Sequence, residues 1–239
     1  MSIELHPSLS RGLTAAGWLV SRHSFSFADH YDPERLQFGA LRVLNDDLIA
    51  PEAGFPMHRH QDMEIVTIPL TGSLRHKDDL GNTAVVQAGE VQAMSAGTGV
   101  HHAEFNASAS EYLSLLQIWI QTATRGIPAS YRQLSFAPDV LQNQLTLLAG
   151  PIENKVENVV GMHQDAYISR GQFDQAATID YTLRKTTHGV YLFCIAGSIT
   201  VEGVTANKGD ALAITDTQLI TLLIAAGTDV VTIEVPMSA

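Results

Sequence analysis

The sequence contains a single cysteine, Cys194, so no disulfide can form within the chain. Cys194 lies in the apolar run 190–196, where we expect a buried, unreactive thiol. No stretch reaches the roughly 18 consecutive apolar residues needed to span a bilayer. Residues 1–17 lack the pattern of a secretory signal peptide. These absences predict a cytoplasmic protein that does not contact a membrane.

Basic residues are scarce as well. Lys and Arg number 14 against 25 Asp and Glu, which gives a formal net charge of −11 at pH 7. The longest basic cluster is Arg184-Lys185. Because direct binding of nucleic acid depends on a basic surface that displaces counterions from phosphates, the composition disfavours nucleic acid as a partner.

Two histidine motifs stand out in the first half of the chain. The first is an H-x-H triplet with His58 and His60, and the second is an H-x-E triplet with His102 and Glu104. Residues two apart on a strand point to the same face, so the two members of each triplet project together. Two such pairs on neighbouring strands would supply four ligands to one divalent transition metal. His101 is out of phase with its neighbours and is expected to lie outside the site.

Other residues near these motifs leave alternatives open. Glu64 follows the H-x-H triplet at an even spacing, so strand phase does not exclude it as a further ligand or a neighbour of the ligands. His76-Lys77-Asp78-Asp79 precedes a turn at Gly81 and is expected to be a solvated hairpin end, with a place at the mouth of the site as the alternative. Phe25 and Phe27 alternate with serines, which predicts two rings on one face, within the core, with the wall of a pocket as the alternative.

Short apolar segments separated by turn signals recur along the chain, which predicts an all-β fold. A connector with helix- and strand-breaking residues lies between residues 122 and 160. We therefore predict an N-terminal metal-binding domain at 1–135 and a second β domain at 136–239. The second half has neither H-x-H nor H-x-E, and His188 stands alone there. A lone histidine is expected to be hydrogen-bonded or exposed rather than a metal ligand.

The motifs resemble those of the pirin family, whose members have two domains and belong to the cupin superfamily. Two departures from the general cupin motifs, Ser95 in place of proline and a longer gap from Gly97 to His102, resemble the pirin pattern. The likeness covers most of the chain. The matching positions are His58, His60, Glu64 and Gly72 in the first motif, and Gly89, Ser95, Ala96, Gly97, His102 and Asn106 in the second.

The resemblance implies two tandem cupin (double-stranded β-helix, or jelly-roll) barrels, the second one degenerate. It also implies that His58, His60, His102 and Glu104 bind the metal. Iron(II) is the first choice by resemblance, while manganese, nickel, cobalt, copper and zinc are chemically admissible.

The likeness is strongest to the bacterial branch associated with quercetin 2,3-dioxygenase activity. It implies a flavonol-like substrate and dioxygen, with ring cleavage and loss of carbon monoxide. Glu104 is the expected catalytic base, and Glu64 is the alternative. A second hypothesis is a non-enzymatic protein that acts on a protein partner according to the metal's redox state. A third is an isomerase or storage cupin.

Overall fold

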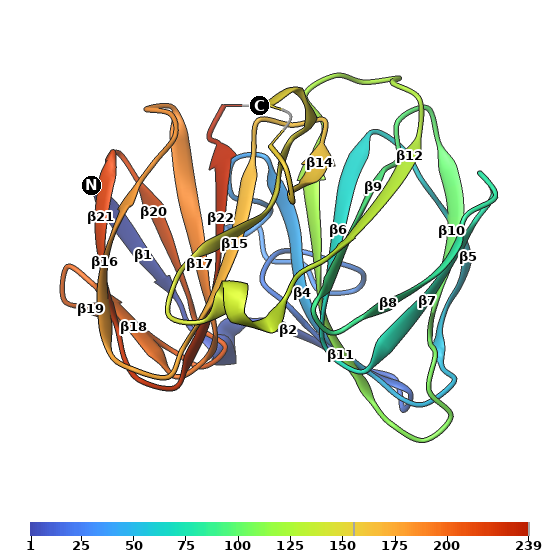
Figure 1. Cartoon of the computed structure of the whole chain (residues 1–239), viewed down its shortest axis with the longest axis horizontal. Coiled ribbons are helices and arrows are strands. Elements are labelled where there is room, and N and C mark those ends of the chain that lie inside the picture. The colour runs from blue at the N-terminus through green and yellow to red at the C-terminus, as the bar shows by residue number, and fades with distance from the viewer. Residues whose placement is uncertain (155, 239) are drawn as a thin grey trace.

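The computed structural model describes residues 1–154 and 156–238, and nearly all of its regular structure is β-strand. Two barrels lie side by side (Figure 1), each built from a seven-stranded and a four-stranded sheet. The predicted all-β fold with two tandem barrels is therefore confirmed. Within the described residues no helix is long and apolar enough to cross a membrane. The helical segments there are the short 3-10 turns Ser8–Ser10, Pro138–Leu141 and Ile152–Asn154.

The first barrel contains both histidine motifs. Its seven-stranded sheet has the spatial order β12 (Ser130–Ser135), β9 (Glu90–Ser95), β6 (Met63–Thr71), β11 (Leu113–Gln121), β4 (Leu41–Ile49), β3 (Leu19–His23) and β2 (Gly12–Ala15). Its four-stranded sheet has the order β5 (Gly54–His60), β10 (Val100–Asn106), β7 (Ser73–Asp78) and β8 (Thr83–Gln87). The motifs therefore lie on adjacent strands of the smaller sheet.

The second barrel repeats this plan. Its larger sheet has the order β1 (Ser2–His6), β20 (Ala211–Thr215), β17 (His188–Ala196), β22 (Thr228–Pro236), β15 (Tyr167–Phe173), β13 (Thr146–Pro151) and β14 (Val160–Met162). Its smaller sheet has the order β16 (Ala177–Thr182), β21 (Leu219–Ile224), β18 (Ser198–Val201) and β19 (Val204–Asn207).

The chain crosses between the barrels at its N-terminus. Strand β1 pairs antiparallel with β20, from Ser2 opposite Thr215 to His6 opposite Ala211. At the other end of the first barrel, β12 pairs with β9. The division proposed between residues 135 and 136 falls between β12 and β13, whereas residues 2–6 lie on the sheet of the second barrel.

The two seven-stranded sheets face each other and share one hydrophobic core. Leu44 and Ile118 enter it from the first barrel, and Ile168, Tyr191 and Ile233 enter it from the second. All of these side chains are fully buried, so this interface fixes the larger sheet of the first barrel as a rigid wall.

The interior of the first barrel is not one apolar core but two. Leu113 and Leu115 belong to one cluster, and Trp119 packs against the other. Gln117 lies between them on the same strand, β11. The polar band between the two apolar clusters is where the histidine motifs meet.

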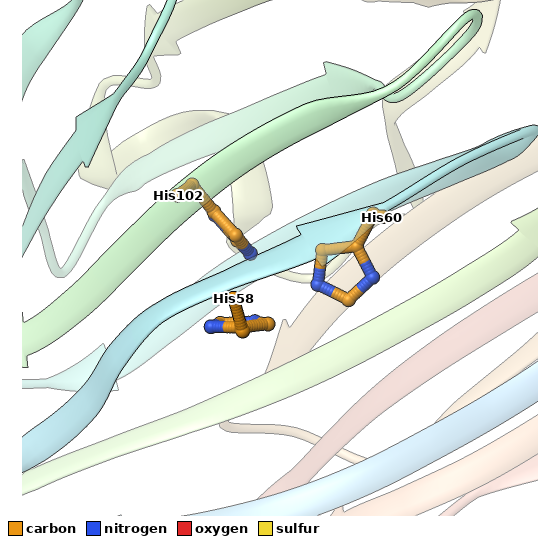
Figure 2. Close-up of side chains that lie close together, drawn as sticks. All are labelled: His58, His60 and His102. Atoms are coloured by element: carbon orange, nitrogen blue, oxygen red, sulfur yellow. The ribbon is translucent and has the colours of Figure 1, made fainter.

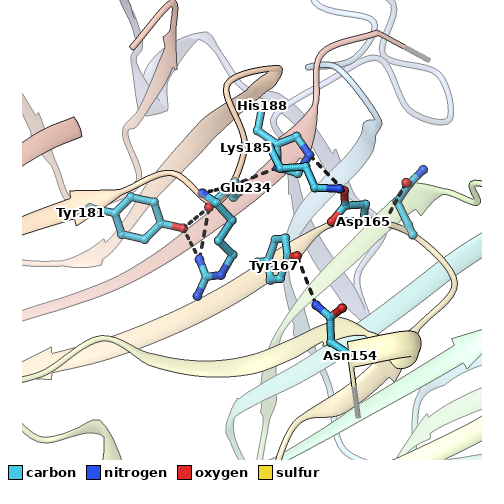
Figure 3. Close-up of polar contacts among 9 residues, drawn as sticks. Asn154, Asp165, Tyr167, Tyr181, Lys185, His188 and Glu234 are labelled. Atoms are coloured by element: carbon cyan, nitrogen blue, oxygen red, sulfur yellow. Dashed lines mark hydrogen bonds and ion pairs between the residues drawn. The ribbon is translucent and has the colours of Figure 1, made fainter. Parts of the chain in front are cut away.

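The second barrel encloses a different polar group (Figure 3), centred on the fully buried Glu234. The Glu234 carboxylate accepts hydrogen bonds from the Tyr181 hydroxyl at 2.8 Å and from the Arg184 backbone N–H at 2.8 Å. His188 Nδ1 lies 3.0 Å from the same carboxylate, and its Nε2 lies 3.6 Å from Asp165. His188 is buried and hydrogen-bonded, as predicted for a lone histidine.

We predict that Glu234→Ala will destabilise the fold by about 3–5 kcal/mol, because it leaves the buried side chains of Tyr181 and His188, and the partly buried backbone N–H of Arg184, without their acceptor. Chemical denaturation measures the effect. Asp180→Ala is the matched control, since Asp180 is an exposed carboxylate of the same barrel that accepts one bond from Thr221. Equal stabilities of the two variants would contradict the role given to Glu234.

Candidate metal centre

On β5 and β10 the side chains of the motif residues alternate between the barrel interior and its surface, as predicted. His102 and Glu104 are buried, whereas His101 between Val100 and His102 is exposed and bonds Asp79 through Nδ1 at 2.9 Å. On β5 the same alternation leaves His58 half-buried, with its Cα directly opposite that of His102. His101 therefore lies outside the cluster that its neighbour joins.

Three imidazoles converge inside the barrel. The ring centroids are 4.5 Å apart for His58 and His102, 4.7 Å for His58 and His60, and 4.8 Å for His60 and His102. One nitrogen from each ring lies within 4.8 Å of the other two. Figure 2 shows His58 and His60 coming from β5 and His102 from β10 toward a common point.

The hydrogen bonds of these rings suit a metal. His58 Nδ1 lies 2.8 Å from the Pro56 carbonyl, which can only accept, so Nδ1 carries the proton and Nε2 keeps a free lone pair. Both ring nitrogens of His102 are buried without a hydrogen-bond partner. A buried unpartnered polar atom costs about 1–3 kcal/mol, and a metal ion at this point would remove that cost for the coordinating nitrogen.

Two of the rings, those of His60 and His102, are kept in the neutral form that binds metals. Burial, together with a smaller contribution from the adjacent His58, lowers the pKa of His60 to about 4. Burial lowers the pKa of His102 to about 2, with contributions from His58 and His60. Near pH 7 the imidazoles of His60 and His102 therefore need lose no proton before they bind a cation.

Glu104 lies beside this cluster and is held from the opposite sheet. Its carboxylate accepts a hydrogen bond from Gln117 Nε2 at 2.8 Å and a long one from Thr67 Oγ1 at 3.5 Å. It groups within 4.8 Å of nitrogens of His76 and His102 rather than with all three clustered imidazoles. Burial and the charge of Asp47 raise the pKa of Glu104 to about 7, against the lowering effect of its hydrogen bonds.

His76 is a site neighbour that the sequence interpretation placed in solvent. His76 and Asp78 are both buried, and His76 Nε2 lies 3.2 Å from Asp78. On β7 they are the Cα partners of Glu104 and His102, respectively. The prediction of a solvated hairpin end was wrong for these two residues, because the strand continues to Asp78 and turns only beyond it.

Comparisons with known proteins agree with this architecture. The pirin profile matches residues 6–120, and the profile of the quercetinase C-terminal cupin domain matches residues 148–235. Quercetin 2,3-dioxygenase of Escherichia coli is 38% identical over 236 residues, 98% of this chain and 99% of that protein. The chain belongs to the pirin family. The predicted family and its two cupin domains are thereby confirmed.

Solved structures show the same pirin fold. The crystal structure of the bacterial pirin YhhW from E. coli in complex with nickel(II) has a TM-score of 0.91 and 38% identity, covering 98% of this chain and 99% of that one. A quercetin 2,3-dioxygenase structure from Acinetobacter baumannii has a TM-score of 0.76 at 17% identity, covering 98% and 79%. At this identity, the similarity to the A. baumannii structure shows a shared fold alone.

Glu64 of this pirin is engaged elsewhere. Its carboxylate accepts hydrogen bonds from Ser95 Oγ at 2.6 Å and from the His163 backbone N–H at 3.0 Å, so it faces the second barrel. The even spacing from His60 was misleading, because a turn with Asp62 at φ +49° separates β5 from β6 and resets the alternation. The structure does not bring Glu64 to the imidazoles.

The two phenylalanines of the N-terminal segment separate. Phe25 is buried in the core between the barrels, with its ring centroid 5.2 Å from that of Tyr191. Phe27 instead lines a cavity and meets Trp119 edge-on at 5.4 Å. The prediction of two core rings holds for Phe25 only, since strand β3 ends at His23 and the alternation stops there.

A cavity of about 370 Å³ adjoins the imidazole cluster. His58, His60 and Glu104 contribute to one part of its lining. Most of the remaining wall is aromatic or aliphatic, with polar groups on the side of the larger sheet. The other lining residues are Thr14, Leu19, Ser21, His23, Phe27, Ala28, Asn45, Asp47, Phe55, Pro56, Met57, Gln117 and Trp119.

A buried polar row crosses the larger sheet and was missed from the sequence. It joins five adjacent strands through direct cross-strand neighbours, which are His23, Asn45, Gln117, Thr67 and Gln92. Thr67 and Gln117 each interrupt a strongly apolar strand, and that interruption is the signal that could have identified these two. The row provides the groups that hold Glu104.

Asp47 lies two residues beyond Asn45 on the same face of β4 and is almost fully buried. Burial raises the pKa of Asp47 to about 7, and the charge of Asp46 adds to this, against lowering by Ser21 and Arg11. Asp47 and Glu104 are thus two buried carboxyl groups of one cavity that disfavour each other's ionisation.

We predict that His60→Ala will lose most of its bound metal while the barrel stays folded, since His60 contributes to the imidazole cluster but not to either apolar core. Elemental analysis of purified protein measures the occupancy. Arg59→Ala, which changes the exposed neighbour on the same strand, is the control. Undiminished metal in His60→Ala would contradict the assignment.

We predict that Asp47→Asn will stabilise the protein more at about pH 8 than at about pH 5. A carboxyl whose folded pKa is raised to about 7 makes stability fall as pH rises from about 4 to about 7, and the amide has no such loss. The charged groups around Asp47 are Asp46, Arg11 and Glu104, and all three stay unchanged in this variant. Thermal unfolding at the two pH values measures the difference, and equal shifts would show that burial does not perturb Asp47.

Proposed function

We propose that this pirin is a metal-dependent dioxygenase that cleaves quercetin or a related flavonol or enol with dioxygen. The observation that carries the proposal is the unpartnered His102 ring, which converges with His58 and His60 beside an aromatic-walled cavity. The 38% identity to the E. coli protein named quercetin 2,3-dioxygenase supports the same reaction class. The substrate preference and the ligand set below are parts of this proposal.

The proposed ligands are His58, His60, His102 and Glu104, which together offer three neutral nitrogens and one carboxylate. Such a donor set suits a first-row divalent metal. When bound, the metal would supply Lewis acidity toward an enolic oxygen and open positions for the reactants. Iron(II) remains our first choice, nickel(II) is the ion in the YhhW structure, and manganese, cobalt, copper and zinc also suit the donors.

The protein's own groups orient the substrate. Phe27, Phe55 and Trp119 present ring surfaces to the cavity, which suits a flat aromatic ligand and keeps water away from the reacting carbons. Trp119 also packs edge-on against His60, with centroids 4.8 Å apart. The aromatic wall and the metal site are therefore one continuous surface.

Glu104 is the proposed catalytic base. Its carboxylate lies beside the imidazole cluster, where it can accept the proton of an enolic hydroxyl bound at the same point. Gln117 and Thr67 hold the carboxylate in place from the opposite sheet. In the proposed reaction two carbon–carbon bonds of the heterocycle break, both dioxygen atoms enter the product, and the carbon between those bonds leaves as carbon monoxide.

We predict that Glu104→Gln will retain part of its metal but lose turnover by roughly 10²–10⁴-fold, because the amide cannot accept the proton. Oxygen uptake on addition of quercetin to metal-loaded protein is the measurement. Glu111→Gln, which changes an exposed carboxylate, is the control.

Two outcomes would revise the proposal. Unchanged turnover in Glu104→Gln at equal metal content would remove Glu104 as the base. No oxygen uptake by the parent protein loaded with iron, nickel, manganese, cobalt or copper would exclude the dioxygenase and favour the redox-dependent regulatory hypothesis.

A further inference from the structure

The cavity beside the imidazole cluster has two chemically different walls. The imidazoles of His58 and His60 belong to the four-stranded sheet. The facing polar groups lie on β3, β4 and β11 of the seven-stranded sheet, which the core between the barrels holds rigid. A ligand that reaches the imidazoles therefore has a second, fixed wall available for recognition.

Most polar groups on this second wall already have protein partners. His23 bonds Thr14 through Nε2 at 2.9 Å and Asn45 through Nδ1 at 2.9 Å. Gln117 donates to Glu104 and accepts from Thr67. These side chains are satisfied within the protein and would gain little from a ligand.

Asp47 differs from them. Its Oδ1 atom is buried and has no hydrogen-bond partner, although the residue is only 3% exposed and lines the cavity. Among the lining residues, all of which the structure describes, Trp119 Nε1 is the other buried polar atom without a partner. A buried acceptor that the protein leaves free destabilises the fold by about 1–3 kcal/mol or more for a charged group.

We propose that Asp47 is a specificity-determining substrate contact, whose carboxylate accepts a hydrogen bond from a substrate hydroxyl other than the one at the metal site. The inference rests on the proposed function, since it names a second contact for the same substrate. The ligand class is a flat aromatic molecule with a metal-binding enol or ketol on one side and a phenolic hydroxyl on another. The apolar residues Leu19, Phe27 and Phe55 would flank the ring between these two points.

Such a contact explains why the fold tolerates a buried carboxyl oxygen without a partner. Binding sites commonly retain groups that reduce stability because the ligand satisfies them. A hydroxyl bonded to a buried carboxylate discriminates strongly against a ligand without that hydroxyl, because the carboxylate is then left desolvated and unpaired.

Two flavonols test the contact. Quercetin carries several phenolic hydroxyls, whereas 3-hydroxyflavone keeps the ketol group and lacks the others. Dissociation constants are measured without oxygen on metal-loaded protein by quenching of tryptophan fluorescence, to which Trp119 in the cavity wall contributes. The quantity compared is the ratio of the two constants, since its change on mutation isolates the contact.

We predict that Asp47→Leu will reduce the preference for quercetin over 3-hydroxyflavone by roughly tenfold or more, through weaker binding of quercetin. Asp47→Asn keeps the side-chain shape and one acceptor oxygen, and should lose part of the preference. It also serves as the test if the leucine variant does not fold. Asp46→Asn, on the other face of β4 and outside the cavity lining, should keep the parent ratio.

The failures are distinguishable. If the parent binds both flavonols and both Asp47 variants keep its ratio, Asp47 does not contact the substrate and the proposed function stands. If the metal-loaded parent binds neither flavonol, the proposed function and this inference both fall.

Discussion

The first barrel depends on bringing three imidazoles to one point while leaving ring nitrogens among them without a partner in the protein. His102 is the extreme case, because both of its ring nitrogens are buried and unbonded. Burial, with a smaller contribution from the neighbouring imidazoles, lowers the pKa of His60 to about 4 and that of His102 to about 2, which keeps both rings neutral. A strand interior normally satisfies its polar groups, so this arrangement makes sense as a place where a cation completes the structure.

The two barrels treat buried polarity in opposite ways. In the second barrel the Glu234 carboxylate accepts from Tyr181, Arg184 and His188, and this group needs nothing from outside. In the first barrel His102 and Asp47 retain unpartnered atoms next to a cavity. One fold thus contains a closed polar cluster that stabilises it and an open one that suits binding, which is why function is assigned to the site and not to the fold.

Local alternation made much of the site predictable from sequence. His102, Glu104 and the exposed His101 occupy the faces that a period of two assigns them, because all three lie on one uninterrupted strand. Cys194 is buried as expected, and burial raises its pKa to about 12. The inference failed where a strand ended between the residues compared, as it did for Glu64.

Other features depend on contacts between distant segments and had no local signal. The burial of His76 follows from its pairing opposite Glu104 across β7 and β10. The polar row from His23 to Gln92 requires five strands in register before its members become neighbours. That Asp47 Oδ1 lacks a partner is visible only once every surrounding group has been placed.

The position of strand β1 affects how the chain can be divided into fragments. Because residues 2–6 complete the large sheet of the second barrel, a fragment beginning at residue 136 would expose β20 as a bare sheet edge. Such an edge invites intermolecular strand pairing. The second barrel therefore depends on the N-terminal strand of the chain, and exchanging the second half between relatives would require residues 2–6 to travel with it.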